Sequence, residues 1–283
     1  VMNANGQQHL HQTYDDWKQK VNKFGFGVKL DVDLPFEKSG LVPSSHYYDK
    51  VFKGPNWHST SIISLAIGQG ELEATPLQLA NIECTIANHG YFYKPHLIKA
   101  IGDQNVIKTE YTKKNYVGID PQYFEPVIDG MQRVVEAGTA RASQIPGIVM
   151  CGKTGTAQNP HGKNHSLFVA FAPRDNPKIA IAVIVEHSGQ VAWWAAPIAS
   201  MIVDKYLTDS IKVRPYGHDP QWFADQNLLP ALKGDHNVPD TPHRKKAQSD
   251  TAVKSRTIKT VETKKKDNAT VYAAAMPKKK EDE

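Results

Sequence analysis

The sequence predicts a fold in which helices pack on an antiparallel sheet. Three segments rich in β-branched and aromatic residues, 148–158, 166–172 and 178–186, follow one another, with turn-like stretches at 159–164 and 173–177 between them. Short connections of this kind join antiparallel neighbours. The last two segments are apolar almost throughout, so we expect both faces of the sheet to be covered.

Four other segments have the apolar spacing of helices, and one of them can cover the sheet. The first begins after Thr13 and ends at Gly25, the second runs from Thr75–Pro76 to Gly90, the third from Asp120–Pro121 to Gly138, and the fourth covers about 193–207. Thr75 is a good N-cap, and Pro76 suits the first helical position because its missing N–H is not needed there. The stretch 24–55 predicts irregular structure.

The charge of the chain is concentrated at its C-terminal end. Lysine and arginine outnumber aspartate and glutamate by five in 230–283, which is the whole net charge of +5, and the two kinds balance in 1–229. The body therefore gives no reason to expect a nucleic-acid partner. The composition of 230–283 cannot bury enough apolar surface to offset chain entropy, so we predict a Lys-rich disordered tail after a domain at 1–229.

Cysteine and histidine usage indicates neither a disulfide framework nor a metal site. The chain has only Cys84 and Cys151, and its 12 histidines show no metal-ligand spacing. We expect Cys151 to pack as a small hydrophobe. The longest apolar run, Ile179–Val185, is too short to span a bilayer.

The sharpest chemical signal is Lys153-Thr154-Gly155-Thr156 at the start of a predicted strand. A lysine here places a positive charge where a substrate carboxylate must be held or a serine proton must be transferred. Gly155 lets a peptide approach the strand backbone because it has no Cβ. The threonines offer hydroxyls, and an edge N–H can stabilise an oxyanion. Alone, the triplet Lys-Thr-Gly also fits a strand edge with a solvated lysine.

Further blocks give this segment its context. They are Ile67-Gly68-Gln69-Gly70, Thr75-Pro76-Leu77-Gln78-Leu79-Ala80, Ala87-Asn88-His89-Gly90 with Lys94-Pro95-His96, Gly138-Thr139-Ala140 and Phe171-Ala172-Pro173. Together with the Lys-Thr-Gly segment, these blocks resemble the class B penicillin-binding proteins, most of all the elongation-type penicillin-binding protein 2 group. The resemblance covers about residues 10–210.

The resemblance implies a fold, a reaction and site roles. The fold is the α+β transpeptidase fold shared with serine β-lactamases, an antiparallel five-stranded sheet flanked by helices. The reaction is D,D-transpeptidation, in which a serine forms an acyl-enzyme with a peptidoglycan stem peptide. Lys153 and the Thr156 N–H, part of the oxyanion hole, are the implied catalytic groups, and Thr154, Gly155 and Thr156 bind substrate. No metal or cofactor is needed. The implied partners are stem peptides, β-lactams and elongation proteins at the periplasmic side of the bacterial inner membrane.

Two motifs of this family are absent from the 283 residues. Neither Ser-x-x-Lys nor Ser-x-Asn/Asp occurs, so we expect the chain to begin downstream of both and to supply three of the five core strands. In the family the last strand pairs with the first, which predicts a bare edge at Ile179–Val185. We therefore expect a fragment that is poorly soluble, or that folds stably only when the missing N-terminal part is present. Two alternatives remain open: a non-catalytic scaffold module of a wall-synthesis complex, and a β-lactam-hydrolysing or sensing relative.

Overall fold

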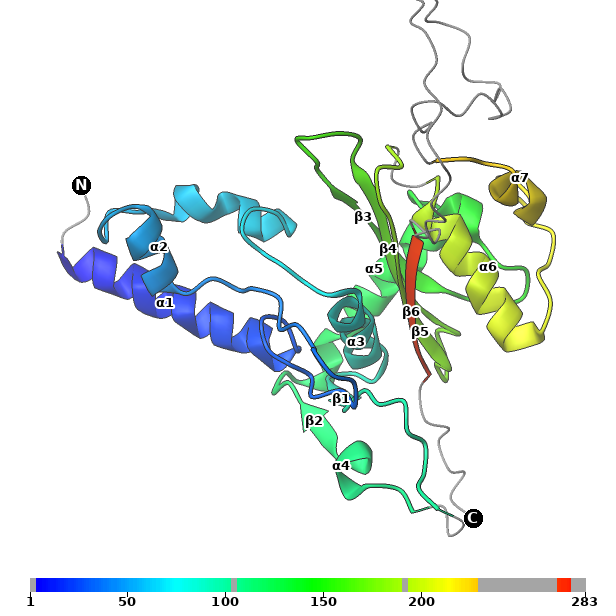
Figure 1. Cartoon of the computed structure of the whole chain (residues 1–283), viewed down its shortest axis with the longest axis horizontal. Coiled ribbons are helices and arrows are strands. Elements are labelled where there is room, and N and C mark those ends of the chain that lie inside the picture. Colours follow the sequence, from blue (N-terminus) through cyan, green and yellow to red (C-terminus); the bar gives the residue numbers. More distant parts are fainter. Residues whose placement is uncertain (1–3, 103–105, 190–192, 229–268, 276–283) are drawn as a thin grey trace, which may run out of the picture.

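The computed structural model describes residues 4–102, 106–189, 193–228 and 269–275 (Figure 1). Its elements, in chain order, are α1 (Ala4–Lys23), α2 (Ser45–Val51), η1 (Ser59–Ile67), α3 (Pro76–Ala87), β1 (Tyr91–Tyr93), α4 (Thr109–Thr112), β2 (Lys114–Tyr116), η2 (Pro121–Tyr123), α5 (Glu125–Glu136), η3 (Arg141–Ser143), β3 (Cys151–Ala157), β4 (His165–Ala172), β5 (Ile179–Val185), α6 (Ala195–Thr208), α7 (Pro220–Ala224) and β6 (Ala269–Ala275). The fold is α+β, as the sequence predicts.

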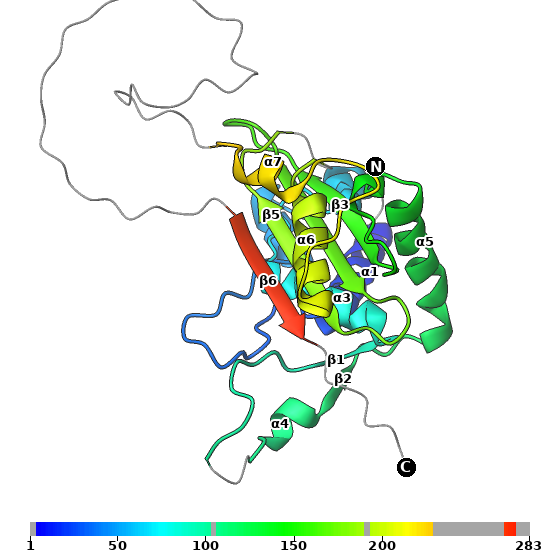
Figure 2. The ribbon, with the colours of Figure 1, turned by 90° about the vertical axis from the view of Figure 1, so that its right-hand side faces the viewer.

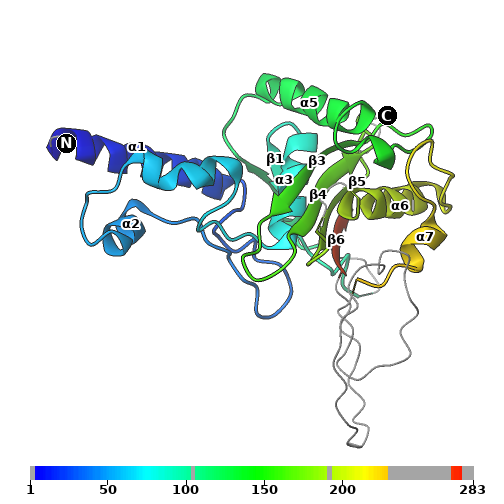
Figure 3. The same ribbon diagram turned by 90° about the horizontal axis from the view of Figure 1, so that it is seen from above.

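The centre of the fold is an antiparallel sheet with the strand order β3-β4-β5-β6. Helix α3 covers one face, α6 covers the other, and α5 lies beside β3 (Figures 2 and 3). Helix α1 projects away from the sheet, together with α2 and η1 (Figure 1). The main core lies between the sheet and α6 and is built from fully buried residues such as Phe168, Ile181, Val183, Ala199 and Val203.

Most of the predicted elements are confirmed. The strands β4 and β5 lie within one residue of their predicted segments, and α6 matches the fourth helix. Strand β3 lies inside its predicted segment, 148–158, but begins three residues later, at Cys151. Helix α3 begins with a full capping box, in which the Thr75 hydroxyl accepts from the Gln78 N–H and the Gln78 side chain accepts from the Thr75 N–H. The third predicted helix is split into the short η2 turn and α5.

The N-terminal predictions need two corrections. Helix α1 begins at Ala4, so Thr13 lies inside the helix rather than at its start. The polar residues before Thr13 carry no apolar stripe, which hid this part of the helix. The stretch predicted as irregular contains α2, which Ser44 caps by accepting from the Tyr47 N–H at 3.2 Å. Tertiary packing stabilises this lobe, because Tyr48 is buried there against other aromatic rings.

The predicted bare edge at Ile179–Val185 is wrong. Strand β6 pairs with β5 along its whole length, from Ile179 opposite Ala275 to Val185 opposite Ala269. The expectation of a structureless tail is therefore wrong for 269–275, and the rest of the tail lies outside the described residues. The mean composition of the tail concealed a local run, Ala-Thr-Val-Tyr-Ala-Ala-Ala, that has no charge and contains residues favoured in strands.

Candidate active site

The Lys-Thr-Gly segment lies on β3, an edge strand among the described residues. Helix α5 packs against the beginning of β3, where Cys151 is fully buried with Ile128 and Met131. Lys153, two residues on, is exposed, and its Nζ donates to the backbone oxygen of Thr154 at 2.6 Å. The motif therefore begins with an exposed lysine on a strand whose first residues are buried in the core.

The four predicted site residues divide between the two faces of the sheet. Side chains alternate along a strand, so Lys153 and Gly155 share one face, and Thr154 and Thr156 share the other. Gly155 lies opposite Leu167 on the α3 face, and Thr154 lies opposite the buried Phe168 on the α6 face. Any ligand that contacts all four residues must therefore lie along the open edge of β3.

A large cavity opens on the face that carries Lys153. Its volume is about 600 Å³, and it lies between α1, α3 and strands β3–β5. Its apolar lining includes Val21, Phe24, Leu79, Ile82, Leu167 and Ile184. Ala157 lines the cavity as well, and it has the same orientation on β3 as Lys153. The cavity thus adjoins the strand that holds the candidate catalytic lysine.

The opposite face joins the motif to the loop between α5 and η3. The Thr154 and Thr139 hydroxyl oxygens lie 2.7 Å apart, a typical O–H···O hydrogen-bond length. Thr154 is only 8% exposed, whereas Thr139 is at the surface. Thr139 and Thr154 belong to separate blocks of the sequence, and nothing in the sequence shows that their side chains meet.

The family model "Penicillin binding protein transpeptidase domain" matches residues 6–205, which is most of the chain and includes every predicted site residue. The chain belongs to the penicillin-binding-protein transpeptidase family. The resemblance drawn from the sequence blocks is thereby confirmed.

Several curated relatives of this penicillin-binding protein are named as transpeptidases. The peptidoglycan D,D-transpeptidase MrdA of Acinetobacter baumannii is 37% identical over 224 residues, which are 72% of this chain and 33% of that protein. The Escherichia coli K12 protein of the same name is 33% identical over 62% of this chain and 31% of its own length. The chain thus spans about a third of the curated relatives that it matches.

Solved structures place the chain in the penicillin-binding protein 2 group. The crystal structure of Pseudomonas aeruginosa PBP2 in complex with WCK 5153 matches with a TM-score of 0.59 and 37% identity over 68% of this chain and 44% of that chain. A complex between PBP2 and MreC from Helicobacter pylori matches with a TM-score of 0.56 and 27% identity over 70% of this chain and 38% of that chain.

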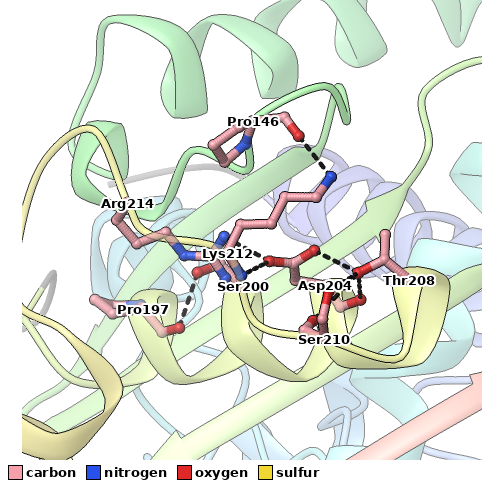
Figure 4. A network of polar contacts seen from close by, with 8 residues as sticks. All are labelled: Pro146, Pro197, Ser200, Asp204, Thr208, Ser210, Lys212 and Arg214. Carbon is pink, nitrogen blue, oxygen red and sulfur yellow. Dashed lines mark hydrogen bonds and ion pairs between the residues drawn. The ribbon is translucent and has the colours of Figure 1, made fainter.

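A buried ion pair fastens the segment after α6 to this helix of the penicillin-binding protein (Figure 4). Asp204 is fully buried and accepts from the Lys212 N–H at 2.8 Å and from Arg214 Nη1 at 3.0 Å. Burial opposes its ionisation, but these donors and the Thr208 hydroxyl outweigh that effect and hold the pKa of Asp204 below its ordinary value. Lys212 Nζ also donates to the Pro146 carbonyl, which ties this segment to the connection that leads into β3.

The two thiols do not provide a nucleophile. Burial raises the pKa of Cys151, and also that of Cys84, to about 12. The thiolate is the reactive form, so both groups are inert at neutral pH. The expectation that Cys151 packs as a small hydrophobe is confirmed by its full burial.

Helix α3 carries a buried carboxyl that was not predicted from the sequence. Glu83 is 2% exposed, and its Oε2 has no hydrogen-bond partner within the described residues. Desolvation by burial raises its pKa to about 8. The only signal in the sequence was a glutamate at a position between the apolar residues Ala80 and Ala87 on one side of the helix.

A membrane-crossing helix is not found in the described part of the chain.

Proposed function

We propose that this chain supplies the Lys-Thr-Gly wall of the active site of a peptidoglycan D,D-transpeptidase. The observation that carries the proposal is Lys153, exposed on an edge strand next to a large apolar cavity, in a chain of this family. A stem peptide could lie along the open edge of β3, with its terminal carboxylate within reach of the lysine and the threonine hydroxyls.

The roles of the site residues follow from their chemistry. The Lys153 ammonium would hold the terminal carboxylate or relay protons, and the Thr154 and Thr156 hydroxyls would donate to that carboxylate. Gly155 would allow close approach of the peptide backbone. The Thr156 N–H would stabilise the oxyanion of the tetrahedral intermediate. The serine would attack the penultimate D-Ala carbonyl and release the terminal D-Ala, and an amine of a second stem peptide would then resolve the acyl-enzyme.

The cavity supports a place for the nucleophile. No Ser-x-x-Lys occurs within the 283 residues, so the serine of this reaction must come from elsewhere in the whole protein. An apolar cavity of about 600 Å³ on the Lys153 face could receive the element that carries it. The peptidoglycan substrate and β-lactams would bind between that element and β3.

The location and partners of the whole protein are part of the same proposal. Peptidoglycan lies outside the cytoplasmic membrane, so the site would work on the periplasmic side of the bacterial inner membrane. Cell-wall elongation proteins are the proposed partners, and the Helicobacter pylori complex of PBP2 with MreC is an assembly of this kind.

Fluorescent penicillin tests the proposal. In the whole protein, Lys153→Ala should slow acylation by roughly a hundredfold or more, as expected for an electrostatic site group. Lys50→Ala, which changes an exposed lysine on α2, is the matched control and should label normally. The 283-residue chain alone should give no covalent adduct. Normal labelling of the Lys153 variant would remove this residue from the site, and a whole protein that never labels would refute the function.

A further inference from the structure

The contact between Thr139 and Thr154 joins the motif to a loop that is held independently of it. Thr139 follows Gly138, where an added Cβ would come within 2.8 Å of the Val134 Cα. The Ala140 N–H donates to the Val134 carbonyl at 3.1 Å, and Ala140 itself is 1% exposed. The backbone thus places Thr139 without help from Thr154.

A second contact braces the same loop from outside. Arg141 Nη2 donates to the Tyr216 hydroxyl at 2.7 Å, and the guanidinium lies over the Tyr216 ring at 4.1 Å from its centroid. Tyr216 belongs to the segment that the Asp204–Arg214 ion pair fastens to α6. The Thr139 hydroxyl is therefore presented to β3 by a loop that is anchored at both ends.

The chemistry of two hydroxyls fixes the direction of their hydrogen bond once an anion binds. Each threonine has one proton to donate and can accept two bonds. A carboxylate only accepts hydrogen bonds, so a Thr154 hydroxyl that binds it must donate its one proton to the carboxylate. The bond between the two hydroxyls must then be donated by Thr139. A donated bond of this kind polarises the next hydroxyl in the chain and strengthens its bond to the anion.

We propose that Thr139 is a positioning residue whose hydroxyl holds and polarises the Thr154 hydroxyl for the carboxylate of the substrate or of a β-lactam. The inference rests on the transpeptidase function proposed above. It adds Thr139 to the residues that make the site prefer ligands with a carboxylate. Thr139 would act on binding of the carboxylate and leave the chemical step of acylation unchanged.

The test is a double-mutant cycle in the whole protein with two probes. Thr139→Val keeps the shape of the side chain and removes the hydroxyl, Thr139→Ser keeps the hydroxyl, and Thr154→Val removes its partner. The acylation kinetics of each variant are resolved into a binding constant and a first-order acylation rate. One probe is a penicillin with its free carboxylate, and the other is the same penicillin as its methyl ester.

We expect Thr139→Val to weaken binding of the acid probe by roughly tenfold, about the value of one hydrogen bond, with the acylation rate nearly unchanged. The methyl ester should bind the unaltered protein and Thr139→Val with the same affinity. Thr139→Ser should bind the acid probe as tightly as the unaltered protein does. The double variant should bind no worse than Thr154→Val, because both changes break the same chain of hydrogen bonds. A purely structural role would weaken both probes equally and would overturn the inference.

Two other outcomes would also overturn it. Additive effects of Thr139→Val and Thr154→Val would mean that Thr139 acts independently, and unchanged binding in Thr139→Val would mean that it does not act. If either occurs while Lys153→Ala slows acylation as expected, only this inference fails. If the unaltered whole protein does not react with penicillin, both the proposed function and this inference are refuted.

Discussion

At the scale of the residue, the Lys-Thr-Gly strand combines exposed chemistry with tight packing. Lys153 reaches solvent, yet the residue before it lies against the core, because an added Cβ at Gly152 would come within 2.5 Å of Phe168 Cζ and 2.9 Å of the Val169 carbonyl oxygen. Phe168 is fully buried and cannot move aside without disturbing its neighbours. The same strand therefore contains a glycine required for packing and, at Gly155, a glycine proposed for substrate approach.

Gly152→Ala should destabilise the protein, and Gly155→Ala should not. Overpacking of a full core costs about 1–3 kcal/mol. At Gly155 the nearest contact of an added Cβ is the Leu167 Cβ at 3.3 Å, so a small shift accommodates it. The free energy of unfolding in urea, measured for both variants, checks this. Equal losses in the two variants would contradict the packing argument.

Glu83 should make the stability of the fold fall as the pH rises. Its pKa is raised to about 8 in the folded state, so the folded protein binds a proton that the unfolded chain has already released above pH 4.5. Stability should decline from about pH 5 to pH 8 and then level off. Glu83→Gln should remove this slope and be more stable than the unaltered protein above pH 8, by up to a few kcal/mol. Glu136→Gln, at an exposed site, is the control and should keep the slope.

At the scale of the element, the sequence predicted those helices and strands whose signals are local. Thr75, Pro76 and Gln78 carry a complete start signal, and α3 begins where they place it. Helix α2 and the β1–β2 pair are too short for periodicity, and contacts with distant residues stabilise them. The motif makes Lys153 a candidate site residue from the sequence alone, but the pairing of Thr139 with Thr154 depends on how a loop docks on a strand.

The Asp204–Arg214 pair is another element-scale feature that depends on distant contacts. Asp204→Asn should cost about 3–5 kcal/mol, because it leaves the Arg214 charge buried without a partner. The pKa of Asp204 lies below its ordinary value of 3.8. Its contribution is therefore complete above about pH 4 and is lost as the pH falls through the folded-state value. Unfolding curves from pH 2 to 7 should show this loss in the unaltered protein and not in Asp204→Asn. Asp209→Asn, at an exposed helix end in the left-handed conformation that asparagine tolerates, should behave as the unaltered protein does.

At the scale of the whole molecule, the sheet is extended by a strand from the far end of the chain. The sequence located the hydrophobic strand Ile179–Val185 correctly but left its edge bare, because the average composition of 230–283 gives no indication of one uncharged run. Pairing with β6 satisfies backbone groups that an edge strand would leave open to other chains. The tail therefore has a consequence for solubility that its lysines alone do not predict.

Breaking β6 should expose that edge. The double substitution Val271→Pro with Tyr272→Pro removes two successive N–H groups, one of which faces β5 in an antiparallel ladder. We expect faster hydrogen exchange of the β5 amides. We also expect concentration-dependent aggregation, because the exposed strand β5 is apolar, rich in β-branched residues and uncharged. Ser255→Pro with Arg256→Pro places two prolines in the same tail outside β6 and should leave both properties unchanged. Hydrogen exchange followed by mass spectrometry, with light scattering on the same samples, measures the two effects. If the β5 amides of the β6 variant stay as protected as those of the control, β6 does not shield this edge, and the solubility of the chain must have another origin.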